Sequence, residues 1–200
     1  MPLLIVLVLA GLAVAESPNG AIEGSVTLKG PGASPVMVYL EGDGPPAVIE
    51  GNKEVAQRSQ RFEPKGLVIA KGESVAFPNR DTQYHNVFSD EPGSSFNLGL
   101  YGPDTSQDRR FDKTGPVHVW CHRHEEMSMQ VLVLPNAWFS FVEEGRYRIE
   151  GVPAGQYTMV AWATEHNIER TEVTVSANGV VTHDFTLQGE RFIRRGGFDR

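Results

Sequence analysis

Short apolar runs with a period of two residues are the feature that most limits what this chain can fold into. From Gly20 onward these runs are separated by Gly, Pro, Asn and Asp, and the chain contains 21 Gly and 13 Pro. No stretch of a dozen residues carries a helical stripe, so the pattern predicts a chain that is nearly all β. With 40% apolar residues in 200, it can bury one good core or two small ones.

The two ends of the chain depart from this pattern. Residues 2–15 are uncharged and apolar and end in small residues, which is typical of a signal peptide cleaved after Ala15. We therefore expect a periplasmic or secreted protein, with membrane contact only if residues 1–15 are retained. Residues 189–200 contain four Arg and are expected to form a flexible basic tail.

The chain has a single cysteine, Cys121, and a formal net charge of −7. One cysteine excludes a disulfide framework, a c-type haem and any all-thiolate metal site. The acidic charge makes nucleic acid an improbable partner and favours basic proteins. An unpaired thiol in an exported chain must be buried, modified or bound to something.

Two patterns are nested in the sequence. Residues 22–28 and 36–42 resemble the opening strands of carboxypeptidase-regulatory-like (transthyretin-like) β-sandwiches, and the usual continuation of such a sandwich is found in residues 145–187. The resemblance implies one sandwich that is split by a second β-domain or shares strands with it. We expect residues 20–46 and 136–188 to form the split sandwich and residues 47–135 to form the second domain.

Soft metal donors are concentrated on one short segment after the expected strand 116–120. Cys121, His124, Met127 and Met129 supply a thiolate, an imidazole and two thioethers within nine residues. Two His, one Cys and a weakly bound Met form the blue-copper arrangement, so this donor set favours copper over hard cations. The segment provides one of the two histidines, and His85 supplies the other.

The residues around these donors resemble those of cupredoxins. The resemblance is carried by the Cys-x-x-His-x-x-Met spacing from Cys121 and by residues 62–64, 67–69, Gly72, 75–79, Asp81 and 85–89. The similar proteins are the plastocyanin, amicyanin and pseudoazurin group and the exported "methylamine utilization protein"-type cupredoxins. The resemblance implies a Greek-key β-barrel with one type 1 copper ion held by His85, Cys121 and His124.

The fourth ligand has two candidates. Amicyanin-like spacing selects Met127, whereas plastocyanin-like and pseudoazurin-like spacing selects Met129. Three residues separate Met127 from the apolar strand 131–133, which suits the shorter loop and favours Met127. By the same resemblance, Asn86 is expected to tie the two ligand segments together outside the metal shell.

Strand alternation suggests a way out for electrons. If Cys121 faces the interior, Val117 and Val119 do so too, while His118 and Trp120 face outward. Trp120 is then covalently adjacent to the thiolate and near the surface, which makes it a candidate electron path. We interpret His118 and His122 as surface or partner-contact histidines.

These features predict an exported blue copper protein that transfers one electron between redox partners, such as a cytochrome and a dehydrogenase or oxidase. Four protein ligands leave no open position for a substrate, so we expect an electron carrier and not an enzyme. The alternative is a copper-binding or storage module, or a structural envelope module, without redox shuttling.

Overall fold

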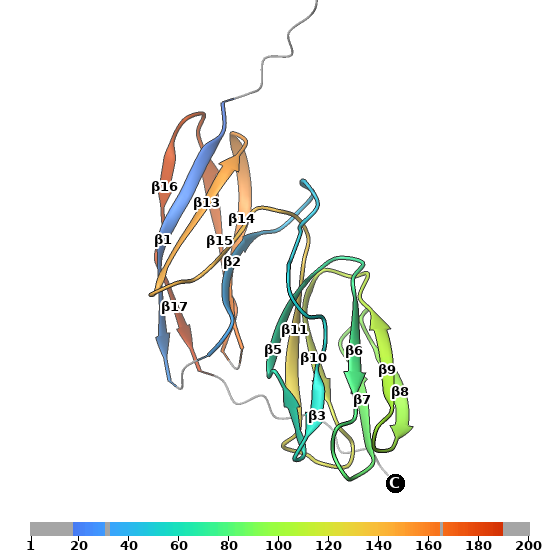
Figure 1. Ribbon diagram of the computed structural model, residues 1–200. Coiled ribbons are helices and arrows are strands. Elements are labelled where there is room, and N and C mark those ends of the chain that lie inside the picture. Colours follow the sequence, from blue (N-terminus) through green and yellow to red (C-terminus); the bar gives the residue numbers. More distant parts are fainter. Residues whose placement is uncertain (1–17, 31–32, 165, 190–200) are drawn as a thin grey trace, which may run out of the picture.

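The fold consists of two β-sandwiches that lie side by side (Figure 1). The computed structural model describes residues 18–30, 33–164 and 166–189, so the expected signal peptide and nearly all of the expected basic tail lie outside the described residues. Seventeen strands and no α-helix occur in the described part, which confirms the all-β class. Accordingly, no described helix has the length and apolar character needed to cross a membrane.

The first sandwich, called here the flanking sandwich, is built from both ends of the described chain. One sheet has the order β13-β1-β16 with β17 also on β1, and the other has the order β12-β2-β14-β15. The strands are β1 (Gly20–Lys29), β2 (Val36–Leu40), β12 (Phe139–Phe141), β13 (Arg146–Val152), β14 (Gly155–Ala163), β15 (Glu169–Val175), β16 (Val180–Thr182) and β17 (Phe185–Gln188).

The second sandwich, called here the central sandwich, is built from the residues between β2 and β12. Its main sheet has the order β5-β11-β10-β7-β8, and two-stranded sheets β3-β4 and β6-β9 complete it. The strands are β3 (Ala56–Arg58), β4 (Arg61–Glu63), β5 (Gly66–Ala70), β6 (Ser74–Pro78), β7 (His85–Ser89), β8 (Phe96–Tyr101), β9 (Ser106–Arg110), β10 (Gly115–Trp120) and β11 (Ser128–Leu134).

The chain leaves the flanking sandwich and returns to it at neighbouring positions. β12 pairs antiparallel with β2, with Phe139 opposite Tyr39. The buried Asn136 side chain, just before β12, donates to the carbonyl oxygens of Leu40 (3.0 Å) and Gly42 (3.0 Å) at the end of β2. These bonds join the two points at which the chain enters and leaves the central sandwich, about a hundred residues apart in the sequence.

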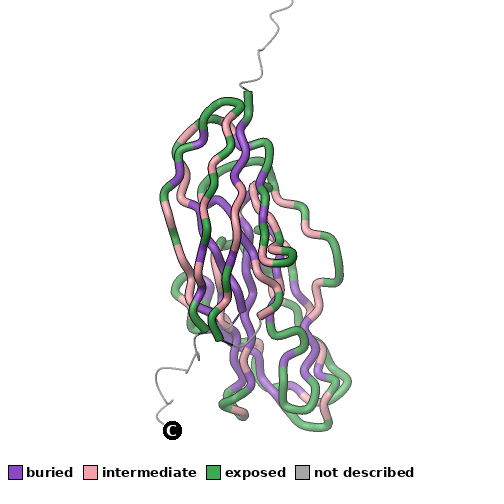
Figure 2. The backbone as a smooth tube through the Cα atoms, turned by 90° about the vertical axis from the view of Figure 1, so that its left-hand side faces the viewer, coloured by how far each residue is buried: buried purple, intermediate pink, exposed green. Residues whose placement is uncertain are grey.

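Each sandwich has its own core, and a third apolar cluster joins them. Figure 2 shows buried residues, in purple, along the strands. In β11 the alternate residues Val131 and Val133 face the central core, while Leu132 and Leu134 face the flanking sandwich. There they meet Trp162 of β14 within the third cluster. Residues 131–134 of β11 are therefore buried on both faces of the strand, which explains why all four are apolar. The contact between the two sandwiches, called here the seam, is therefore packed with buried apolar side chains as a core is.

We expect the seam to contribute strongly to stability. Replacing Leu132 by Ala should lower the free energy of unfolding by about 2–5 kcal/mol, because the side chain is fully buried and a cavity would remain. The matched control is Leu100→Ala in β8, where the side chain is 58% exposed and the expected change is within about 0.5 kcal/mol. Urea unfolding of both variants measures the difference, and equal small effects would contradict a packed seam.

Candidate metal centre

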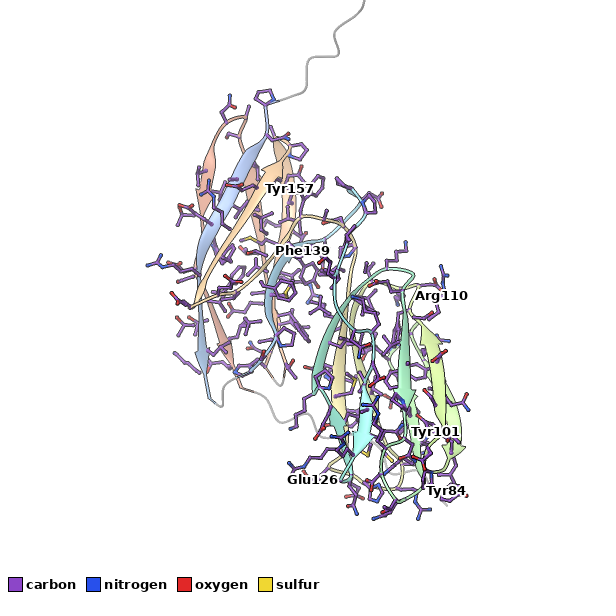
Figure 3. The ribbon with its side chains drawn as sticks, in the orientation of Figure 1. Tyr84, Tyr101, Arg110, Glu126, Phe139 and Tyr157 are labelled. Atoms are coloured by element: carbon purple, nitrogen blue, oxygen red, sulfur yellow. The ribbon has the colours of Figure 1, made fainter. Side chains whose placement is uncertain are left out.

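The expected donors come together at one end of the central sandwich, the end at which Tyr84 and Glu126 are seen (Figure 3). His85 begins β7, and Cys121 follows the last residue of β10. The turn between β10 and β11 is closed by Met127 N, which donates to His124 O (3.0 Å), and by Cys121 N, which donates to Met127 O (3.1 Å). The turn therefore holds all three loop donors through backbone bonds.

The thiol and the two imidazoles form a triangle. Cys121 Sγ lies 3.8 Å from His85 Nδ1 and 3.8 Å from His124 Nδ1, and the three donor atoms all lie within 4.8 Å of one another. His85 is fully buried, Cys121 is 2% exposed, and His124 is partly exposed. The triangle thus has two buried corners and one that approaches the surface.

This spacing fits a first-row transition metal. A metal bound at about 2.1 Å from a nitrogen and about 2.3 Å from a sulfur, with an angle of about 120° between them, separates the two donors by about 3.8 Å. Both nitrogen–sulfur distances have this value. The soft thiolate and the two imidazoles also match the preference of copper. His85, Cys121 and His124 are therefore suited to hold a copper ion.

An aspartate orients the first histidine. His85 Nε2 lies 3.0 Å from Asp81 Oδ2, so that nitrogen carries the proton and donates, which leaves Nδ1 with its lone pair toward Cys121. A histidine that donates its second ring nitrogen to a carboxylate is the usual support of a metal ligand. The sequence had placed Asp81 only among the residues of the cupredoxin resemblance, and its position four residues before His85 was the available signal.

Asp81 is itself held as a charged acceptor. Its Oδ2 accepts a hydrogen bond from Gln60 N (2.7 Å), and its Oδ1 accepts one from Thr82 N (2.8 Å). The bond from Gln60 is the main cause that lowers the pKa of Asp81 below its ordinary value, and His85 and Thr82 lower it further against the opposing effect of burial.

Burial is the main influence on the pKa of the second histidine, His124. It lowers the pKa of His124 below the ordinary value, and the electrostatic effects of His85 and Arg123 lower it further, while Asp81 acts in the opposite direction. The neutral form of His124, which is the form that binds a metal, is therefore favoured.

Asn86 links the two ligand segments. Its Oδ1 accepts a hydrogen bond of 2.7 Å from His122 N, the residue directly after Cys121. Its Nδ2 donates to Asn97 Oδ1 (3.2 Å) in β8. The side chain next to one histidine therefore fixes the backbone next to the thiol, which is a link of the kind expected for Asn86.

Strand register separates the two methionines. Met129 lies opposite Val119 in the β10–β11 ladder, and the backbone bond from Cys121 to Met127 continues that ladder by one pair. Directly opposed side chains of an antiparallel pair are closer than diagonal ones. Met127 is thus the cross-strand neighbour of Cys121, and Met129 lies two pairs further along the strand, opposite Val119. Both are buried in the central core.

Trp120 differs from the expectation. Val117, Val119 and Cys121 face the central core as alternation predicts, but Trp120 is only 7% exposed and is therefore not a surface residue. Its ring stacks with that of His118, with centroids 6.0 Å apart and planes at 19°. Alternation predicts which side of a sheet a residue faces, but not whether that side is covered.

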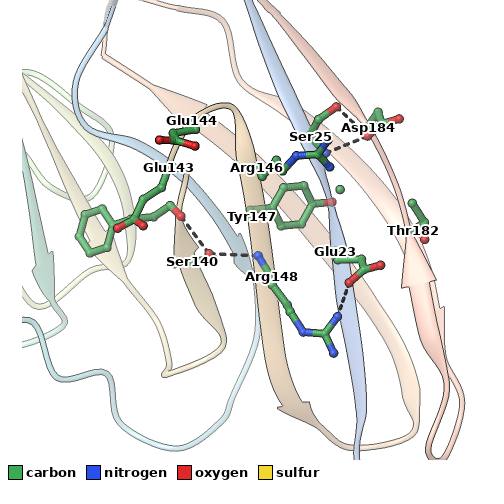
Figure 4. A pocket seen from close by; sticks show the side chains of 12 residues that line it. Glu23, Ser25, Ser140, Glu143, Glu144, Arg146, Tyr147, Arg148, Thr182 and Asp184 are labelled. Atoms are coloured by element: carbon green, nitrogen blue, oxygen red, sulfur yellow. Dashed lines mark hydrogen bonds and ion pairs between the residues drawn. The ribbon is translucent and has the colours of Figure 1, made fainter.

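A large surface hollow lies away from the metal-site residues. It measures about 1170 Å³ and lies on the outer face of the β13-β1-β16 sheet of the flanking sandwich, where Arg148 pairs with Glu23 and Asp184 accepts two bonds from Ser25 (Figure 4). These charged groups are exposed and mutually paired, as expected of a solvated sheet face. None of the metal-site residues lines this hollow.

Comparison with known proteins gives partial matches. A family model described as polysaccharide lyase family 4, domain II, matches residues 138–183 of the flanking sandwich, which was compared above with transthyretin-like sandwiches. No curated protein matches the chain.

Among solved structures, a purple cupredoxin from Nitrosopumilus maritimus is 21% identical, covers 41% of this chain and 99% of its own, and has a TM-score of 0.38. A Cu(I) form of an amicyanin variant is 20% identical, covers 48% of this chain and 97% of its own, and has a TM-score of 0.39. A reduced form of a second amicyanin variant is 21% identical with the same coverage and TM-score.

The support from Asp81 can be tested through metal affinity. Asp81→Ala should weaken copper binding by about 10–100-fold, because His85 loses the carboxylate that orients its ring. Asp112→Ala, at an exposed carboxylate paired with Arg110, is the control and should bind copper as the unaltered chain does. Competition titration with a chelator measures both affinities, and an unchanged value for Asp81→Ala would refute this role.

Proposed function

We propose that the protein is an exported electron carrier with one type 1 copper ion bound by His85, Cys121 and His124. The observation that carries the proposal is the buried triangle in which both Nδ1 atoms lie 3.8 Å from Cys121 Sγ. Copper bound there would take up and release one electron.

The role of the protein would be to keep the donor atoms in place while the charge of the copper ion changes. His85 is oriented by Asp81, Cys121 is held by the backbone of Met127, and Asn86 ties the two ligand segments. Donors that are fixed before the reaction need little rearrangement during it, which suits electron transfer. With four protein ligands no position is open to a substrate, and we therefore propose a carrier without substrate turnover.

We propose Met127 as the axial ligand and Met129 as a core residue. The support is the register, in which Met127 lies across from Cys121 and Met129 lies across from Val119. The spacing of the loop in the sequence favours the same choice.

The cellular setting is proposed from the sequence. Residues 1–15 have the character of a signal peptide, so we place the protein in the periplasm or outside the cell, with membrane contact only if that segment is retained. Its partners would be redox proteins, a cytochrome or a dehydrogenase or oxidase, and not nucleic acid.

A copper-storage role is the alternative, but the cluster of His85, Cys121 and His124 favours an electron carrier. The described residues contain one group of three metal-binding side chains, which suits a single ion per chain. A storage module would bind several Cu(I) ions per chain.

The colour of the copper-loaded protein tests the proposal. The oxidised protein should be intensely blue, with one copper per chain, and a mild reductant should bleach it reversibly, because the thiolate of Cys121 is a copper ligand. Cys121→Ser should lose the colour, and His183→Ala, in the flanking sandwich, should keep it. A colourless copper-loaded protein, or a blue colour that persists in Cys121→Ser, would refute the electron-carrier proposal. Binding of several Cu(I) ions per chain would support copper storage instead.

Two matched variants identify the axial ligand. Met127→Leu should shift the reduction potential and the visible spectrum, because it removes a thioether beside the metal, whereas Met129→Leu should leave both unchanged. Both residues are buried and the exchange conserves volume, so each variant should lose less than about 1.5 kcal/mol of stability. Electrochemistry and absorption spectra decide, and the reverse pattern would assign Met129.

A further inference from the structure

One face of β10 connects the metal centre with the seam between the sandwiches. Pro116, His118 and Trp120 alternate with the core residues of that strand, so their side chains share its outer face. Trp120 is bonded through the backbone to Cys121, and its ring stacks on that of His118. Two aromatic rings thus extend away from the thiol along the strand.

His118 is held in place from two sides. Gln130 Nε2, whose amide nitrogen can only donate, lies 2.5 Å from His118 Nε2, which therefore accepts. The other ring nitrogen, Nδ1, lies 3.5 Å from Glu91 Oε2. Although held in this way, the His118 side chain is 20% exposed. The ring therefore joins a buried tryptophan to solvent.

The ring leads to a pocket that both sandwiches build. The pocket has a volume of about 440 Å³ and is lined by Tyr39 and Arg170 of the flanking sandwich and by Glu91 and Pro116 of the central one, among others. Glu91 is the residue that faces His118, and Pro116 precedes His118 on the same face of β10. Glu91 therefore both lines this pocket, called here the seam pocket, and contacts the His118 ring.

We infer that the protein exchanges electrons with a redox partner at this seam, through Trp120 and His118, and that the flanking sandwich forms half of the docking position. The inference rests on the proposed copper centre. In each transfer one electron leaves the reduced centre and reduces a one-electron acceptor protein, or moves in the opposite direction from a donor protein. No bond is made or broken and no proton moves.

The chemistry of the seam suits a short-lived complex. The pocket walls carry both signs of charge, with Glu41 and Arg170 paired at 3.0 Å and with Lys113 and Glu91 on the opposite wall. Polar, mixed-charge surfaces are typical of weak redox encounters and not of permanent interfaces. A partner that docks here touches both sandwiches, which gives the flanking sandwich a role in partner choice.

A ruthenium label at the pocket tests the route. A thiol-reactive ruthenium polypyridyl is attached to Thr114→Cys, at an exposed residue that lines the pocket, in the copper-loaded full chain, where Cys121 is buried and metal-bound. After a laser flash and quenching, one electron passes from the reduced centre to the Ru(III) label, and the returning blue absorption gives the rate. The control label is attached to Leu100→Cys in β8, which pairs with β7 and not with β10.

His118→Ala should slow transfer to the Thr114 label by about tenfold or more, equivalent to about 1.4 kcal/mol in the activation free energy, and leave transfer to the Leu100 label unchanged. His118→Phe, which keeps a ring, should restore most of the rate. The visible spectrum and the reduction potential should be the same in all variants. An unchanged rate at Thr114, or an equal fall at both labels, would overturn the route, whereas absence of a reversible blue centre would instead overturn the proposed function.

Discussion

Two-sided burial of β11 is the constraint on which the rest of the structure depends. One face of the strand completes the central core and the other is sealed by the flanking sandwich. A shift of the β11 register by one residue would exchange the residues on its two faces. Because both faces are apolar, this exchange is opposed mainly by the residues that differ between the faces, the polar Gln130 and the thioether of Met129. Because the ligand turn leads directly into β11, the register that packs the seam also sets Met127 opposite Cys121. Packing energy far from the metal centre thus determines the geometry of the centre.

The candidate metal donors could be predicted from the sequence because their chemistry is local, and the structure brings His85, Cys121 and His124 together. A thiol, an imidazole and two thioethers in nine residues have few uses apart from metal binding, and the remote His85 was identified by its own neighbours. The all-β class followed from alternation for the same reason. Contacts between segments that are distant in the sequence could not be predicted. Alternation placed Trp120 on the outer face of the sheet, but only the fold shows that Trp120 is covered there. The apolar run 131–134 within β11 likewise does not reveal that a second sandwich covers it.

The centre is an example of support that comes from outside the donor set. Asp81 orients His85, and Asp81 is in turn held by the backbone of Gln60 in the turn between β3 and β4. Asn86 ties the backbone after Cys121 to β7 and β8. His85 and the backbone after Cys121 are therefore supported from outside the ligand turn, so the triangle depends on the central sandwich as well as on that turn.

The pairing of β2 with β12 has a consequence for how the chain folds. These strands are neighbours in space although the entire central sandwich separates them in sequence, so the flanking sandwich can close only after its ends have been brought together. An unfolded insert of that length would make the closure entropically costly, whereas a folded one presents its two ends at the seam side by side. The entropic cost of closure therefore favours an order in which the central sandwich folds before the flanking one closes.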